Sequence, residues 1–159
     1  MKHVRRCLST VALSIVCACS QNSEPSRARV LPETSSFRDF GSYVVHFNAI
    51  STTQLTPEVA REYGIVRSGN RAMLNVSVIR NEAASIGSAV DATVRASAVN
   101  LAGQRRELDF REIREQTAIY YITEFSIANQ ETLTFTIEVT PLEEQRTFSV
   151  RYVKQFFVD

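Results

Sequence analysis

The chain has 159 residues, enough for one domain, and 44% of them are hydrophobic, which is ordinary for a globular core. Its 18 basic and 17 acidic residues nearly balance. This balance argues against nucleic acid as a partner, because nucleic-acid binding rests on an excess of positive charge that faces the phosphates.

The first 18 residues have the features of a secretory signal. Lys2, Arg5 and Arg6 form a basic segment, and residues 8–18 form an apolar stretch that is too short for a membrane-spanning helix. Without this leader, the remaining chain has 15 basic and 17 acidic residues, a net charge of −2. We therefore predict a signal peptide at residues 1–18.

The end of the leader resembles a bacterial lipobox, in which a small residue precedes the cysteine that receives the lipid. Cys19 fits this pattern because Ala18 precedes it, whereas Cys17 follows the larger Val16. We predict lipidation of Cys19, and Ser20 after it favours delivery to the outer membrane over retention in the inner membrane. The alternative is ordinary cleavage, which would release a soluble periplasmic protein.

Residues 19–36 are polar and show no periodicity, so we predict a flexible tether that leads to a folded domain at residues 37–159. All three cysteines lie before residue 20. The folded domain therefore has no disulfide and no thiolate for catalysis or metal binding. Because it also has a single histidine, we expect neither a metal nor a cofactor.

One short helix is predicted in the folded domain, at about residues 56–63. Thr56 can cap its start, Pro57 suits the first helical position, and Gly64 suits the left-handed conformation that ends a helix. Val59 and Tyr63 fall on one face. A helix of two turns is not stable alone, so we expect this apolar face to pack against the rest of the domain.

The rest of the domain consists of segments in which apolar and polar residues alternate. We predict about seven strands, at residues 42–50, 72–80, 89–100, 107–115, 118–127, 132–140 and 147–158. This pattern indicates an all-β fold, an immunoglobulin- or fibronectin-like antiparallel β-sandwich with the short helix between the first two strands. An up-and-down barrel is the alternative, although such barrels usually have eight strands.

The alternation breaks once, within residues 107–115. Leu108 and Phe110 agree in phase, whereas the next apolar residue is Ile113. We predict a β-bulge near Arg111 and Glu112, which would restore the register. Alternatively, the strand ends there and Ile113 belongs to a loop.

The sequence offers few candidates for chemistry. His46 is the only histidine after the leader, and the sequence places neither a nucleophile nor an orienting carboxylate beside it. We therefore predict no catalytic residue. Arg67, Asn70 and Arg71 surround the turn after the helix and are candidates for an anion-binding nest. Alternatively, they cap the helix or form hydrogen bonds within the turn.

Two further arginines, Arg111 and Arg114, belong to the charged run at residues 111–115. They are candidates for binding a partner or an anionic ligand. Alternatively, the run is a solvated strand edge whose mixed charges discourage aggregation.

Four motifs occur in order along the domain: SYVVHFNAI, TPEVAREYGIVRSGNRAMLNVSV, LDFREIREQTAIYYITEFSI and a terminal QFFVD. Together they resemble the proteobacterial envelope family catalogued as domain of unknown function 4426, over about residues 40–159. The resemblance implies secretion and an immunoglobulin-like β-sandwich, and it implies no activity. The chain departs from the family in its cysteine-ended leader and polar tether, where a plain cleavable signal is usual.

These observations predict a non-enzymatic envelope lipoprotein that faces the periplasm. We expect its β-sandwich to bind another envelope protein through loops or an exposed strand edge. The alternative is a small-ligand or glycan-binding domain, or a weak hydrolase, that uses His46, Tyr63, Arg67 and Arg71 near the helix.

Overall fold

The computed structural model describes residues 29–83 and 85–158. The predictions of a signal peptide, of lipidation at Cys19 and of the first part of the tether fall on residues 1–28, outside the described residues.

Strands dominate the described chain, with two short helices between β3 and β4. The strands are β1 (Val30–Leu31), β2 (Phe37–Asp39), β3 (Tyr43–Ser51), β4 (Arg71–Arg80), β5 (Ser88–Ala89), β6 (Ala92–Asn100), β7 (Arg105–Leu108), β8 (Arg111–Glu115), β9 (Ala118–Ser126), β10 (Glu131–Pro141) and β11 (Phe148–Phe156). The helices are η1 (Thr52–Gln54) and α1 (Pro57–Glu62).

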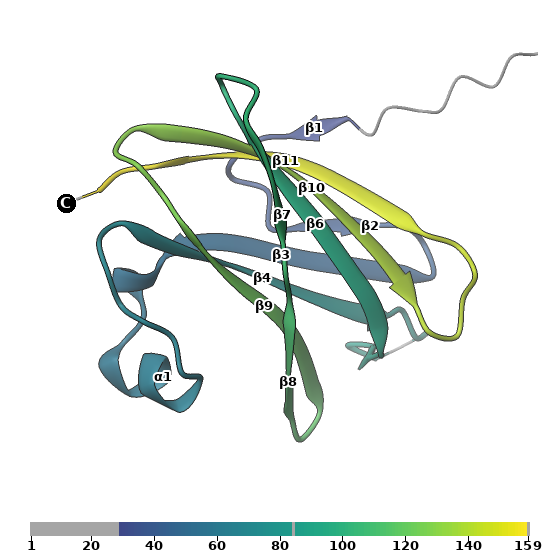
Figure 1. The fold of residues 1–159 in the computed structure, drawn as a ribbon. Helices are drawn as coiled ribbons and strands as arrows, with labels where there is room; N and C mark the ends of the chain where they lie inside the picture. Colours follow the sequence, from purple (N-terminus) through teal and green to yellow (C-terminus); the bar gives the residue numbers. More distant parts are fainter. Residues whose placement is uncertain (1–28, 84, 159) are drawn as a thin grey trace, which may run out of the picture.

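The strands form two sheets that pack face to face (Figure 1). The first sheet has the order β1-β11-β10-β6-β7, and the second has the order β2-β3-β4-β9-β8, with β5 paired to β4. The predicted β-sandwich is therefore confirmed, and the barrel alternative is wrong. The sandwich is antiparallel except at one edge, where β1 runs parallel to β11.

Two of the predicted strands are each two strands, because the chain changes sheets within them. In the segment predicted at residues 89–100, β5 pairs with β4 in the second sheet and β6 pairs with β10 in the first. The inward phase continues across the change, since Val90 and Ala92 are both buried. A strand that bends from one sheet into the other is a known way to form a sandwich corner.

The second change of sheet explains the broken alternation at residues 107–115. β7 pairs with β6 in the first sheet, whereas β8 pairs with β9 in the second. The predicted β-bulge is therefore wrong. The alternative is right that the strand ends, at Leu108, and wrong that Ile113 belongs to a loop. Ile113 lies in β8, where it packs against a hydrophobic cluster outside the sandwich core.

The last part of the predicted tether lies against the domain. Val30 and Leu31 pair with Arg151 and Tyr152 of β11, at the edge of the first sheet. Beyond them, Glu33 accepts a hydrogen bond from the Lys154 ammonium at 2.7 Å, which lowers the pKa of the Glu33 carboxyl. This stretch is therefore part of the sandwich edge.

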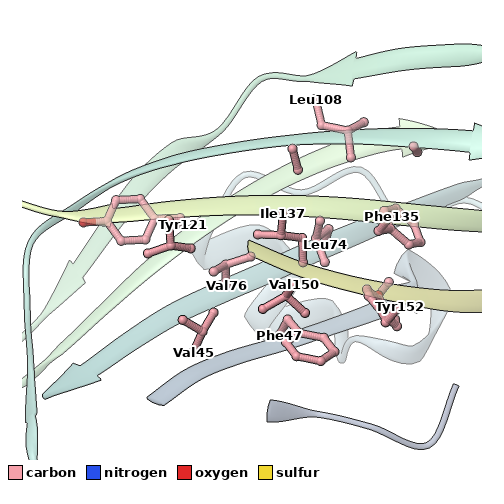
Figure 2. Packing of buried hydrophobic residues seen from close by; sticks show 14 of the residues in the cluster. Val45, Phe47, Leu74, Val76, Leu108, Tyr121, Phe135, Ile137, Val150 and Tyr152 are labelled. Carbon is pink, nitrogen blue, oxygen red and sulfur yellow. The ribbon is translucent and has the colours of Figure 1, made fainter. Parts of the chain in front are cut away.

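The core fills the space between the sheets with side chains from both (Figure 2). Its centre is aromatic, since the ring of Tyr152 lies 4.8 Å from that of Phe47 and 5.1 Å from that of Phe135. The predicted inward residues of β10, which are Leu133, Phe135, Ile137 and Val139, are all fully buried. The last strand is paired, as its apolar residues require.

Candidate functional site

Helix α1 forms where the sequence predicts it. The Thr56 hydroxyl accepts a hydrogen bond from the Val59 N–H at 3.3 Å, and Pro57 occupies the first turn. Thr56 and Tyr63 are the capping residues at its two ends. The helix lies beside the second sheet, on the side away from the first sheet (Figure 1).

The chain turns back sharply after the helix. Gly64 has a φ of 62°, the left-handed conformation that glycine adopts at little cost, and the Ile65 N–H donates to the Ala60 carbonyl at 2.7 Å. Ala60 and Ile65 are both buried. The turn therefore folds Ile65 back toward the apolar face of the helix.

This face covers a second hydrophobic cluster, separate from the sandwich core. Its buried members are Ala60, Ile65, Met73 and Ile122, with Ile50, Leu55, Tyr63, Ile113 and Tyr120 packed around them. In β4, Leu74 points into the core, so its neighbour Met73 must point to the outer face of the second sheet. The helix thus shields apolar residues that the sheet would otherwise present to water.

A pocket lies within this cluster, between α1 and the outer face of the second sheet. Its volume is about 320 Å³, at the low end of the range for small-molecule sites. The apolar lining consists of Ile50, Leu55, Val59, Ile65, Met73, Ile113 and Ile122, and the other lining residues are Asn48, Tyr63, Asn75, Glu115 and Tyr120. We call this cavity the α1 pocket.

The polar groups of the α1 pocket include hydrogen-bond donors and acceptors, and one of them, the Glu115 carboxylate, is charged. The Tyr63 hydroxyl donates to Oε1 of Glu115, which ties the end of the helix to the end of β8. Asn48 and Asn75 are paired across β3 and β4. The Oδ1 atom of Asn75 is buried, and no donor from the described part of the chain reaches it.

Of the predicted site residues, Tyr63 is the one that lines this pocket. His46 lies further along β3, exposed, with its ring 5.9 Å from that of Phe37. The Arg111 guanidinium donates to the Tyr63 carbonyl, so it helps to hold the end of the helix. Arg114 points elsewhere and pairs with Asp91 and Glu112; these hydrogen bonds raise the pKa of its guanidinium.

The residues of the predicted nest form hydrogen bonds within the protein. Arg67 donates to the Thr53 carbonyl at 3.1 Å, and Asn70 Oδ1 accepts from the Ser68 hydroxyl at 2.6 Å. Arg71 forms an ion pair with Glu124 at 3.2 Å. The structure therefore does not bring His46, Arg67 and Arg71 together with Tyr63 in one pocket.

Sequence reasoning missed Asn48, Asn75 and Glu115 as pocket residues. A signal for the pocket was nevertheless present, because apolar residues occupy the outward phase of several strands: Ile50 in β3, Met73 in β4 and Ile113 in β8. Outward apolar residues on neighbouring strands need a cover, and the short helix is the element available to provide it.

Residues 29–83 and 85–158 hold no group of three or more histidine, cysteine, aspartate or glutamate side chains arranged to bind a metal ion. In the same residues, no helix combines the length and the apolar character needed to cross a bilayer.

The fold and the site thus define a β-sandwich domain with an apolar pocket under a short helix. Residues 37–159 match the family described as "Domain of unknown function (DUF4426)". Because this match covers most of the chain, the protein belongs to the DUF4426 family.

Solved structures agree with this assignment. A DUF4426 family protein from Pseudomonas aeruginosa is 35% identical, with a TM-score of 0.66, and the match covers 77% of this chain and 94% of that one. FetP from uropathogenic Escherichia coli is 12% identical, with a TM-score of 0.57 and coverage of 77% and 93%. A copper-bound FetP variant gives a TM-score of 0.58 at 12% identity, with coverage of 77% and 95%. FetP shares the fold; no curated protein matches the chain.

Proposed function

We propose that this protein is a non-enzymatic binding protein of the bacterial cell envelope and that the α1 pocket is its binding site. The single observation that carries the proposal is the pocket itself, with apolar walls and a few polar groups between a short helix and a sheet. This combination is typical of sites for small molecules, in which apolar walls give affinity and polar groups fix orientation.

The leader and the lipobox support a location in the envelope. We propose that a lipid on Cys19 holds the domain at the periplasmic side of the outer membrane. The surroundings of His46 favour binding over catalysis, because within the described residues no carboxylate or hydroxyl forms a hydrogen bond or ion pair with it. A catalytic histidine needs such partners.

A pocket-filling variant tests the site. Val59→Trp places a large ring in the α1 pocket, so we expect the fluorescence rise of the neutral apolar dye Nile red to be lost. The matched control is Val66→Trp, because Val66 is 60% exposed and does not line the pocket. Equal dye binding by wild type and both variants would show that the dye binds elsewhere and would refute the pocket as the site.

A methionine label supplies a readout that does not depend on the variant. Met73 lines the pocket and is, with Met1, one of only two methionines in the chain. A sample labelled with ¹³C at the methionine methyl groups therefore gives one signal from the pocket. Met1 lies in the proposed leader, so Met73 gives the one methionine signal of the processed chain. We expect Nile red to shift this signal; an unmoved Met73 signal at saturating dye would contradict the proposal.

A second candidate function is the docking of another envelope protein at one end of the sandwich. Ile86, after β4, is fully exposed, and Leu142, after β10, is 68% exposed. Both flank β5, and an ion pair between Arg80, the last residue of β4, and Glu143 links β4 to the loop that holds Leu142. Exposed large apolar side chains on adjacent loops favour contact with a protein partner.

This second candidate is tested by co-purification in mild detergent. We expect a double variant, Ile86→Ser with Leu142→Ser, to lose an envelope protein that the wild type retains. Leu101→Ser is the control, since Leu101 is 85% exposed in a different turn. Retention of the same protein by the double variant would rule out this end of the sandwich as the interface.

A further inference from the structure

We infer that the α1 pocket selects small organic cations, namely compounds with a primary ammonium group on an apolar chain or ring. The inference rests on the proposed function, which makes this pocket a binding site, and adds the chemical class of the ligand. It follows from the one charged group and the aromatic rings that line the cavity.

Glu115 is the one charged side chain in the pocket lining. No cationic side chain of the described residues lies within ion-pair distance of it, and its hydrogen bond from Tyr63 engages Oε1. The nearby Arg111 guanidinium is directed to the Tyr63 carbonyl. Glu115 therefore presents a negative charge that a cation in the pocket can pair with.

Two aromatic rings favour the same ligand. Tyr63 and Tyr120 also line the cavity, and tyrosine ring faces attract ammonium groups. An anion is disfavoured, because the pocket lining offers it a carboxylate and no cationic side chain.

The apolar walls and the volume define the rest of the ligand. A volume of about 320 Å³ suits a small molecule. Since most of the lining is isoleucine, leucine, valine and methionine, the body of the ligand must be apolar to gain from burial. A medium-length alkylamine combines this body with an ammonium head.

Displacement of Nile red by three matched ligands tests the inference at pH 7. The ligands are octylamine, 1-octanol and octanoate, which share one chain length and differ in charge. We expect octylamine to compete about tenfold better than 1-octanol, as a charge-assisted hydrogen bond implies. We expect octanoate to compete worst.

Three variants separate recognition of the cation from other effects. Glu115→Gln should bring octylamine and 1-octanol to within about twofold of each other. Glu62→Gln is the control, since it removes the same charge from the exposed side of α1. Tyr63→Phe keeps the aromatic ring in the pocket and removes only the hydroxyl that donates to Oε1 of Glu115, so it should keep the amine preference. If Glu115 served only to hold the helix through Tyr63, Glu115→Gln and Tyr63→Phe would act alike.

The outcomes distinguish this inference from the proposed function. If Nile red binds in the pocket but 1-octanol and octylamine compete equally, the cation preference is wrong and the binding site stands. If Nile red does not bind in the pocket at all, the proposed function fails first. An amine preference that survives Glu115→Gln would also overturn the inference, because the charge that carries it would be irrelevant.

Discussion

Two buried tyrosines place their hydroxyl groups in opposite situations. The Tyr121 oxygen accepts a hydrogen bond from the Ala92 N–H at 2.8 Å, at the point where the chain has just changed sheets. The Tyr152 hydroxyl is buried in the aromatic centre of the core without a partner among the described residues. Burial raises the pKa of both phenols, so both hydroxyls stay protonated at neutral pH.

Tyrosine-to-phenylalanine substitutions at these two positions should therefore differ in sign. Tyr121→Phe leaves a buried backbone N–H without an acceptor and should lower the free energy of unfolding by about 1–3 kcal/mol. Tyr152→Phe removes an unpaired hydroxyl while keeping the ring packing, and should raise the free energy of unfolding by about 1 kcal/mol.

Urea unfolding followed by circular dichroism measures both values, and each variant serves as the control for the other. Equal destabilisation by the two substitutions would mean that the Tyr152 hydroxyl has a partner in solution.

Of the residues that line the pocket, Tyr63 was predicted from the sequence as a binding residue, whereas Asn75 and Glu115 were not. The chemistry of a site depends on which outward residues the sheet register brings together. Asn48 faces Asn75 because β3 and β4 pair in one particular register, and no local pattern reveals a register across 27 residues. The sequence therefore identified a candidate residue at the end of the helix, whereas the set of residues that line the pocket could be identified only from the structure.

At the level of the elements, the strand predictions were wrong at two segments, each predicted as one strand, that contain two strands in different sheets. Residues 89–100 keep one inward phase throughout, because both sheets face the same core. The alternation of apolar and polar residues indicates which way side chains point, but not which strand a segment pairs with. This change of sheet therefore cannot be seen in the sequence. At residues 107–115 the change of sheet did break the alternation of apolar and polar residues. The break could not be interpreted from the sequence, because Ile113 packs against the hydrophobic cluster under α1, whose position the sequence does not reveal.

Gly87, in the turn that leads into β5, has no room for a larger side chain, and this predicts how its substitution changes stability. Gly87 and Gly103 both have a φ of 78°. A Cβ atom at Gly87 would lie 2.4 Å from the Arg80 carbonyl oxygen and 2.6 Å from Ile79 Cγ2, whereas one at Gly103 would meet nothing within 4 Å. Gly103→Ala should cost about 1–2 kcal/mol of stability, the cost of the left-handed conformation alone.

Gly87→Ala should cost clearly more than Gly103→Ala, because the clash with the β4 backbone adds to the same conformational cost. Thermal unfolding of the two variants side by side gives the comparison. A smaller loss for Gly87→Ala would show that β5 does not pack against β4 as described.

For the whole molecule, the first expectation concerns attachment to the membrane. When the chain is expressed with its leader in a bacterial host, we expect the membrane fraction to contain a protein whose mass corresponds to an acylated chain that begins at Cys19. Cys19→Ser should move the protein out of that fraction, because the lipid has lost its attachment site. Intact mass spectrometry after fractionation provides the measurement.

Cys17→Ser is the matched control, since it changes the other cysteine near the cleavage site and should leave the attachment intact. A wild-type protein without lipid, found in the soluble periplasmic fraction, would refute the anchor. Binding of a diffusible ligand at the α1 pocket would remain compatible with that result.

The parallel pairing of β1 with β11 determines how the domain would respond to mechanical force. The two strands run in the same direction, so a pull on the start of β1 against a pull on the end of β11 slides them past each other (Figure 1). Such a load acts along the strands and strains their backbone hydrogen bonds and the Glu33–Lys154 contact together, not one after another. A domain stretched between its two ends would therefore meet its first resistance at this edge.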